Sequence, residues 1–195
     1  MKNTRIQLSI LTISLFGILL TFACNRKEKV KDMDTELAKD YTLAEGTFND
    51  VLRIADDASE TASGGNLGDY KTASNCATVT HDTLASPKTI TIDFGSSNCL
   101  CNDNRFRRGK ILVSYTGQYK MAGSVHTVQF DNYFVNDNQV TGSKTVTNMG
   151  LNTANQTYFT IVVNGLIIKS TGDSINWNST RTRTWTQGES TLAKA

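Results

Sequence analysis

The spacing of apolar residues changes once along the chain, and this change constrains the fold more than any other feature. Between residues 34 and 65 apolar side chains recur at spacings of three and four, which is the pattern of one face of an α-helix. These are Leu37, Tyr41, Ala44, Phe48, Val51, Ala55, Ala58 and Ala62. Asp34 is a suitable N-cap and Gly64-Gly65 ends the pattern. We therefore predict one long amphipathic helix over residues 34–65.

Beyond residue 70 the period falls to two, which is typical of half-buried strands. In "VHTVQFDNYFV", Val128, Phe130 and Phe134 are expected on one face, and "KTITIDFG" and "GKILVSYTGQY" alternate in the same way. We predict strands near residues 88–95, 108–119, 125–135, 139–147, 157–163, 166–171 and 174–186. The Asn164-Gly165 pair is the strongest short hairpin signal and is expected to join two of them.

Together these elements predict an α+β fold, with one long N-terminal helix packed on an antiparallel β-meander sheet. Sequential strands with short connections usually pair in order. The second half of the helical stripe is mainly alanine, which lets a helix lie close to a sheet, so we favour packing on the chain's own sheet over a coiled coil. The helix and residues 66–195 are expected to form a single globular domain.

The N-terminus has the pattern of an export signal. The basic start "MKNTR" precedes an uncharged apolar run that ends at Ala23-Cys24. A run of about 17 apolar residues is near the lower limit for a membrane span, and a small residue before a cysteine resembles the bacterial lipobox. We predict that residues 1–23 are a lipoprotein signal peptide, that Cys24 is the lipid anchor, carrying palmitate or a similar acyl chain, and that residues 24–33 are a tether. An ordinary signal peptide that contains a cysteine is the alternative.

Charge argues against nucleic acid as a partner. The formal net charge of +2 includes Lys2 and Arg5, so the chain beyond the predicted signal is neutral. A neutral chain lacks the basic surface that binds nucleic acid. The basic residues that follow Cys24 are expected to be a solvated tether that is attracted to anionic headgroups.

Three further cysteines suggest a disulfide, because exported proteins meet an oxidising compartment. We favour Cys76 with Cys99, a pairing worth roughly 3 kcal/mol in the chain-entropy model; Cys76 with Cys101 is the alternative. A zinc site is disfavoured because no histidine motif lies near the Cys-x-Cys segment. We predict no metal and no other cofactor.

Catalytic patterns are sparse. The sequence has two histidines, and His126 alternates with Val128, which favours a packed structural role. His81 adjoins Asp82, but two neighbours in sequence do not make a catalytic dyad. Because no Gly-x-Ser-x-Gly, His-Glu-x-x-His or phosphate-binding glycine loop occurs, we predict that the chain is not an enzyme.

The last predicted strand offers a candidate ligand surface. Its alternation places Trp177, Arg181, Arg183 and Trp185 on one face. Such a face can stack on a sugar ring or hold an anion. The alternative is that the tryptophans cap the core and the arginines extend to its edge.

Two other polar groups are predicted to be structural. The basic cluster Arg105, Arg107, Arg108 and Lys110 is expected to pair with Asp93 or Asp103 and to protect a sheet edge. Residues 101–104 and 136–138 are rich in Asn and Asp, which suits turns, and they lack the spacing of a calcium loop.

The phrases "TITIDFGSSNC", "RFRRGKILVSYTGQY", "VHTVQFDNYFVNDNQVTGSKTVTN" and "WNSTRTRTWTQGE" resemble a group of uncharacterised envelope lipoproteins of Bacteroidota type, over about residues 24 to 190. The resemblance implies a place in the cell envelope and a β-rich fold, and it implies no activity.

The function predicted from these features is that of a lipid-anchored outer-membrane lipoprotein that acts as a non-enzymatic binding or structural module. Its expected partners are the membrane, through Cys24, and a glycan or another envelope protein. The alternative is a periplasm-facing carrier or assembly factor that holds an apolar ligand between helix and sheet.

Overall fold

The computed structural model describes residues 33–62 and 76–187, so the predicted signal peptide, Cys24 and nearly all of the tether lie outside the described residues. The chain divides into two compact units, Met1–Ala38 and Lys39–Ala195. Helix α2 (Met33–Ala62) begins in the first unit, and its later turns and the sheet belong to the second. No helix in the described part of the chain is long and apolar enough to cross a membrane.

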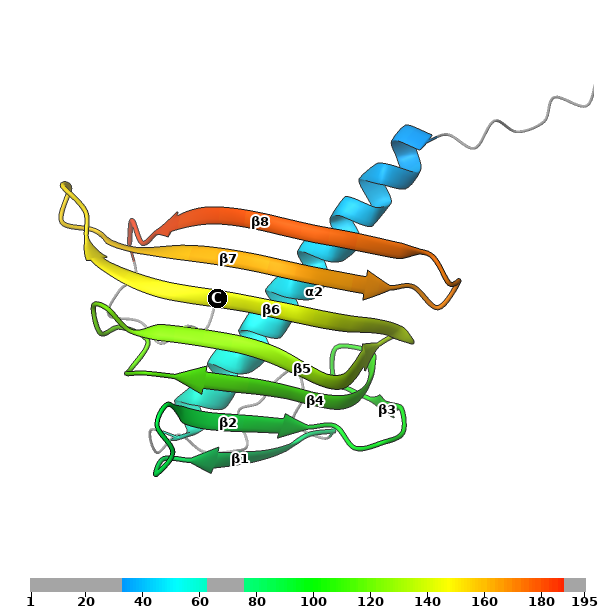
Figure 1. Cartoon of the computed structure of the whole chain (residues 1–195), viewed down its shortest axis with the longest axis horizontal. Helices are drawn as coiled ribbons and strands as arrows, with labels where there is room; N and C mark the ends of the chain where they lie inside the picture. The colour runs from blue at the N-terminus through cyan, green and yellow to red at the C-terminus, as the bar shows by residue number, and fades with distance from the viewer. Residues whose placement is uncertain (1–32, 63–75, 188–195) are drawn as a thin grey trace, which may run out of the picture. The chain divides into compact units, whose positions relative to one another are not determined.

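The second unit is a helix on an antiparallel sheet, which confirms the predicted α+β fold (Figure 1). The strands are β1 (Thr78–Asp82), β2 (Lys88–Asp93), β3 (Cys99–Leu100), β4 (Phe106–Tyr115), β5 (Val125–Val135), β6 (Asn138–Leu151), β7 (Thr157–Ile168) and β8 (Ser174–Thr184). They pair in the order β1-β2-β4-β5-β6-β7-β8, and the short β3 pairs with β4 outside this path. The sheet is therefore the predicted meander.

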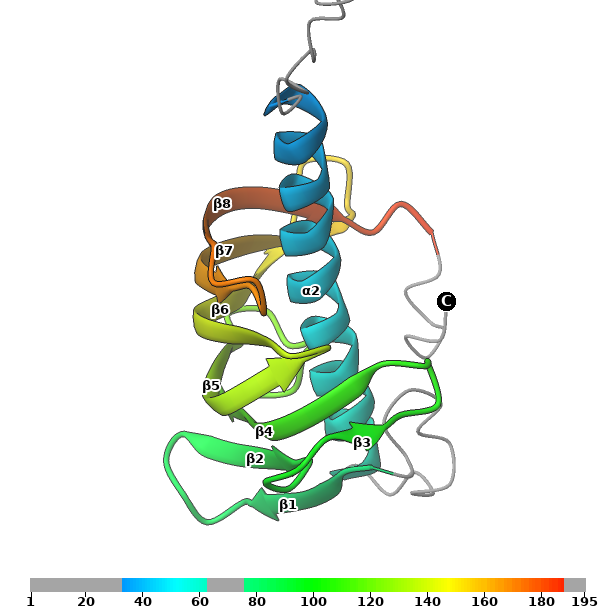
Figure 2. The ribbon, with the colours of Figure 1, turned by 90° about the vertical axis from the view of Figure 1, so that its right-hand side faces the viewer.

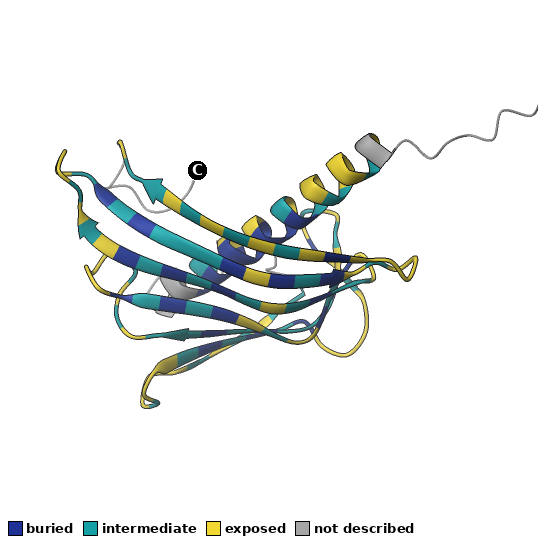
Figure 3. Cartoon of the chain, turned by 45° about the horizontal axis from the view of Figure 1, so that its top comes forward, coloured by how far each residue is buried: buried dark blue, intermediate teal, exposed yellow. Residues whose placement is uncertain are grey.

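From Lys39 onward the helix lies against one face of the sheet (Figure 2). Phe48, Val51 and Ile54 on the helix face Ile90, Ile111, Val128 and Ile167 on the strands, and all are at most 1% exposed. Buried and more exposed residues alternate along the strands, as a sheet with one covered face requires (Figure 3). The predicted helical stripe is thus confirmed at Phe48 and Val51.

The predicted hairpin at Asn164-Gly165 is wrong, because β7 runs unbroken through both residues. Gly165 pairs with Gly142 of β6 and lies directly under the ring of Phe48. A Cβ atom at Gly165 would stand 2.1 Å from a ring carbon of Phe48. The glycine is therefore needed for the close approach of the helix and not for a turn.

The alternation predicted along β5 holds only as far as Phe130. The register between β4 and β5 shifts there, where Asn132 has a positive φ of 47°. A bulge of this kind adds one residue and exchanges the two faces beyond it. Tyr133 and Val135 are buried as a result, and Phe134 points outward, contrary to prediction, with the guanidinium of Arg108 3.8 Å above its ring.

Candidate functional site

Three of the four residues of the predicted ligand surface lie in β8 and the fourth, Trp185, follows this strand directly, but they belong to two separate contacts. At one end the ring of Trp177 packs edge-on against Tyr41 of α2, with centroids 4.8 Å apart. Beside it Arg181 forms a two-bond ion pair with Glu45, also on the helix. The hydrogen bond from Arg181 holds the pKa of Glu45 below its ordinary value. Trp177 and Arg181 therefore hold the helix to the edge strand, and in this structure their contacts are those of packing residues.

The other end of the surface joins an aromatic corner, which we define as Tyr119, His126, Phe159, Arg183 and Trp185. The ring of Phe159 lies 5.0 Å from that of Trp185 and 5.0 Å from that of Tyr119, and the ring of His126 is 5.2 Å from Tyr119. The guanidinium of Arg183 lies 5.2 Å from the Phe159 centroid and donates to the hydroxyl of Tyr119. Rings from β5, from β7, from the loop before β5 and from the segment after β8 thus meet at this corner, and two of them, Tyr119 and Phe159, flank the guanidinium of Arg183.

The cation of the corner is unusual in having no acidic partner. Arg183 forms no ion pair with a carboxylate among the described residues, and its Nε atom is buried without a hydrogen-bond partner there. Within the part of the chain that the structure describes, its contacts are the hydroxyl of Tyr119 and the faces of Phe159 and Tyr119, which attract a cation weakly in comparison with a carboxylate. A guanidinium without a carboxylate partner can still donate hydrogen bonds to an anionic ligand.

A second cation, Lys144, lies nearby under the helix and is 2% exposed. Its Nζ donates to the carbonyl oxygen of Phe48 at 2.9 Å and to Oδ1 of Asn49 at 3.4 Å. Burial lowers its pKa to about 8, and the charge of Arg183 acts in the same direction. The carboxylates of Glu45 and Asp56 act in the opposite direction and favour the charged form of Lys144, so cations and carboxylates are interspersed in this part of the structure.

The histidines have structural environments. His126 is 7% exposed, and its Nε2 lies 3.0 Å from the carbonyl oxygen of Gly117; burial lowers the pKa of the ring. Asp82 does not orient His81, because its Oδ1 accepts the backbone N–H groups of Leu84 and Ala85. The described residues hold no group of three His, Cys, Asp or Glu side chains that could bind a metal.

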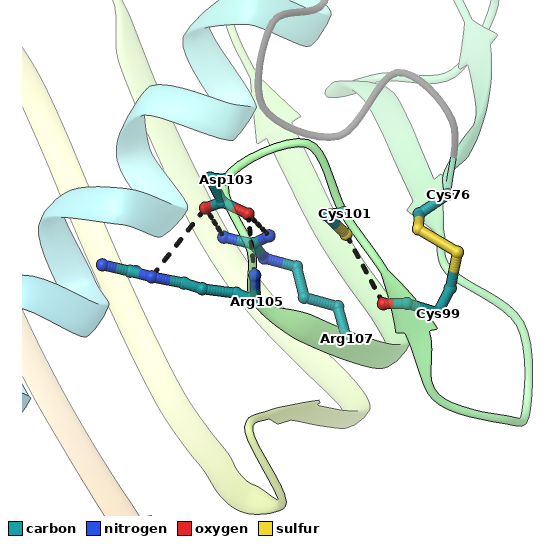
Figure 4. The surroundings of a disulfide bond; sticks show 6 residues. All are labelled: Cys76, Cys99, Cys101, Asp103, Arg105 and Arg107. Carbon is teal, nitrogen blue, oxygen red and sulfur yellow. Dashed lines mark hydrogen bonds and ion pairs between the residues drawn. A yellow bond between two sulfur atoms is a disulfide. The ribbon is translucent and has the colours of Figure 1, made fainter.

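The basic cluster at the start of β4 is partly buried and forms an ion-pair network (Figure 4). Arg107 is fully buried, and its Nη2 lies 2.6 Å from Asp103 Oδ2 and 2.6 Å from Asp50 Oδ2. The predicted pairing with Asp103 is confirmed for Arg105 and Arg107, and Lys110 pairs with Asp93 at 3.1 Å. Protection of an edge is the wrong interpretation for Arg107, because this side chain holds the helix to the sheet.

The cysteines follow the favoured pairing. Cys76 and Cys99 form a disulfide with Cα atoms 5.7 Å apart, and Cys101 is a buried free thiol (Figure 4). The Cys101 sulfur lies 3.8 Å from the carbonyl oxygen of Cys99, and burial raises the pKa of its thiol. This thiol is therefore protected and unreactive at neutral pH.

Comparison with known proteins gave no match to a protein-family model, to a curated protein or to a solved structure. The fold and the site therefore rest on the geometry described above.

Proposed function

We propose that the chain is an outer-membrane lipoprotein, anchored by a lipid on Cys24, and that its domain binds a ligand without transforming it. The aromatic corner is the observation that carries the binding proposal. It combines flat apolar rings with a guanidinium that has no acidic partner among the described residues. The anchor is supported by the Ala23-Cys24 sequence that ends the apolar run.

A glycan is the partner that this corner suits best. Aromatic rings stack on the C–H faces of sugars, while an arginine orients polar or anionic groups beside them. Trp185 and Tyr119 are both partly exposed, so their rings are accessible from solvent. Another envelope protein that presents an acidic residue beside an apolar one has the same chemistry and is the second partner class.

Trp177 of β8 and Trp185, which directly follows this strand, provide a matched test of this proposal. Trp185→Ala should abolish retention of the full-length protein, in detergent, on immobilised envelope glycans. Trp177→Ala should retain binding, because that ring contacts Tyr41 and is outside the corner. The melting temperature of each variant is the control for folding. Equal loss of binding and folding in both variants would assign both rings to the core and contradict the proposal.

The anchor is tested separately. Cys24→Ser should prevent incorporation of radiolabelled palmitate and release the protein from the membrane fraction, whereas Cys101→Ser should leave both unchanged. Labelling that persists in Cys24→Ser would reject this residue as the lipid attachment site. Protease treatment of intact cells, with a lysed control, then distinguishes a surface domain from a periplasmic one.

A further inference from the structure

The two edges of the sheet differ in length (Figure 1). Strand β1 forms one edge and has 5 residues, whereas β8 forms the other and has 11. Every residue of β8 pairs with β7 without a shift of register, and the strand contains no proline. Short length, bulges and proline are features that keep an edge strand from pairing with a further strand. Strand β8 has none of these three features.

The backbone groups that β8 directs away from the sheet are those of its even-numbered residues. At one end of the strand the N–H of Trp185 donates to the carbonyl oxygen of Thr157. At the other end the carbonyl oxygen of Asp173 accepts the N–H of Lys169. Odd-numbered positions are thus bonded toward β7, and successive residues of a strand direct their backbone groups to opposite sides. The outward groups, which meet no further strand in the described part of the chain, belong to Asn176, Asn178, Thr180, Thr182 and Thr184.

Helix α2 passes over one face of this edge. The ring of Tyr41 packs edge-on against Trp177, and Glu45 pairs with Arg181, so the helix lies on the side of the odd-numbered side chains. Tyr41 is nevertheless 55% exposed. A strand added beside β8 would carry alternate side chains on this same face. Apolar side chains there would pack beside the rings of Tyr41 and Trp177.

The position of the helix argues against a second copy of this chain as the added strand. Two copies of β8 that pair antiparallel along their full length meet at Ser179, the middle of the strand. Trp177 and Arg181, on either side of Ser179, both contact α2. Two helices, each about 10–12 Å wide with side chains, would then need the same space above Ser179. A segment without a helix on this face avoids the conflict.

The charge of β8 indicates the chemistry of the partner segment. The charged residues of the strand are Arg181 and Arg183, and it has no acidic residue. Arg181 pairs with Glu45, whereas Arg183 forms no ion pair with a carboxylate among the described residues. Residues that lie opposite or diagonal to each other on paired strands are close enough for long side chains to interact. An acidic residue near Arg183 therefore complements this edge.

We propose that β8 binds an extended segment of a partner protein as the next antiparallel strand of the sheet. The segment exchanges backbone hydrogen bonds with the even-numbered residues of β8, and these bonds provide most of the affinity. Its side chains alternate, with apolar ones toward α2, small polar ones beside the exposed Thr180 and Thr182, and an acidic one opposite Arg183. This interaction requires neither the lipid anchor nor glycan binding.

The probe is the acetylated peptide Thr-Glu-Thr-Val-Thr-Val-Thr-Val-Thr. In antiparallel orientation it runs opposite Thr184 to Asn176 and places its glutamate opposite Arg183. Calorimetry with the full-length protein in detergent should show saturable binding. Replacing the glutamate by lysine should weaken binding roughly threefold or more, because attraction across the strands becomes repulsion. No saturable binding, or equal binding of the two peptides, would overturn the proposal.

Two methylated peptides test the backbone contact while the protein stays unchanged. N-methylation of the central threonine, opposite Thr180, removes an N–H that points to β8 and should weaken binding roughly tenfold or more. N-methylation of the following valine, opposite Ser179, removes an N–H that points away from β8 and should change binding less than about threefold. Equal weakening by both would show that the peptide does not bind as a strand on this edge.

Thr180→Pro and Thr180→Ala are the matched variants of the protein. The N–H of Thr180 points away from β7, so proline removes no hydrogen bond of the sheet, and the melting temperature should stay close to that of the wild type. Peptide binding should weaken roughly tenfold or more in Thr180→Pro and stay within about threefold in Thr180→Ala. A folded Thr180→Pro that binds like the wild type would contradict the proposal.

Other occupants of the edge give different results. A wild type that sediments as a dimer, with Thr180→Pro as a monomer, would assign the edge to a second copy and overturn the partner segment. A variant ending at Gln187 that binds the peptide roughly tenfold more tightly than the full chain would assign it to residues 188–195. Trp185→Ala should lose glycan retention and keep peptide binding, so the edge and the aromatic corner are tested independently.

Discussion

The buried ammonium of Lys144 should make the stability of the domain depend on pH in a defined window. Its pKa falls from 10.5 in the unfolded chain to about 8 in the folded one, chiefly through burial. The folded state then binds fewer protons than the unfolded state between these values, so the free energy of unfolding rises with pH. The shift corresponds to about 3 kcal/mol of destabilisation, which is present in full below pH 8 and disappears as the pH approaches 10.5.

Two tyrosines limit the useful range. Burial raises the pKa of Tyr119 and of Tyr133, so both resist ionisation when folded. Above about pH 10 they ionise in the unfolded chain, and stability falls again. Burial also raises the pKa of the Cys101 thiol, so ionisation of this thiol in the unfolded chain lowers stability from about pH 8.5 upward. The contribution of Lys144 is therefore measured between pH 8 and pH 10 as the difference between the wild type and a variant that keeps Cys101 and both tyrosines.

Lys144→Met is the variant that isolates this effect. Methionine has a similar length and no charge, so the free energy of unfolding at pH 7 should rise by about 1–3 kcal/mol, after the loss of the hydrogen bond to Phe48. Urea denaturation at half-unit steps of pH measures both proteins. The free energy of unfolding of the wild type should rise relative to that of the variant from pH 8 to 10, by up to about 1.4 kcal/mol per pH unit. Parallel curves for the two proteins would refute the assignment.

Two further pairs of variants test the packing of helix on sheet, each by urea denaturation at pH 7. Arg107→Met should lose roughly 3–5 kcal/mol because it leaves buried carboxylates short of a partner, while Arg108→Met, whose ion pair is exposed, should have a much smaller effect; equal losses would contradict the role given to the buried network. Gly165→Ala should lose about 1–3 kcal/mol by clashing with Phe48. Gly46→Ala, on the open side of the helix, should gain about 1 kcal/mol, and a loss there would show that its surroundings are closed.

Local periodicity predicted the parts of the fold that depend on local sequence. The helix predicted over 34–65 is observed at Met33–Ala62, and the strand predicted over 125–135 is observed at Val125–Val135. The role of Gly165 could not be predicted from local sequence. A glycine is required there because the ring of Phe48, which is distant in sequence, lies against it in the folded chain. Strand β1 was missed because Val79 is its only strongly apolar inward residue.

The candidate site was predicted only in part, for the same reason. Alternation correctly placed Arg181 and Arg183 on one face of β8. Alternation could not show that Arg181 pairs with Glu45 of the helix. It also could not show that Arg183 pairs with no carboxylate among the described residues. The burial of Lys144 could have been predicted from the sequence. It shares one face of β6 with Val140 and Val146, so it occupies a position where an apolar residue is expected.

Three cations face the helix from otherwise apolar positions of the sheet. The partners of each cation indicate whether its role is in packing or in binding. Arg107 is balanced by two carboxylates, one from the helix, and Lys144 by a helix carbonyl and an asparagine. Arg183 has only aromatic rings and a tyrosine hydroxyl among the described residues. A cation that serves packing alone is normally paired, because an unpaired charge away from water is costly. The lack of a carboxylate partner for Arg183 among the described residues therefore supports the aromatic corner as the place where a ligand supplies the hydrogen-bond acceptor.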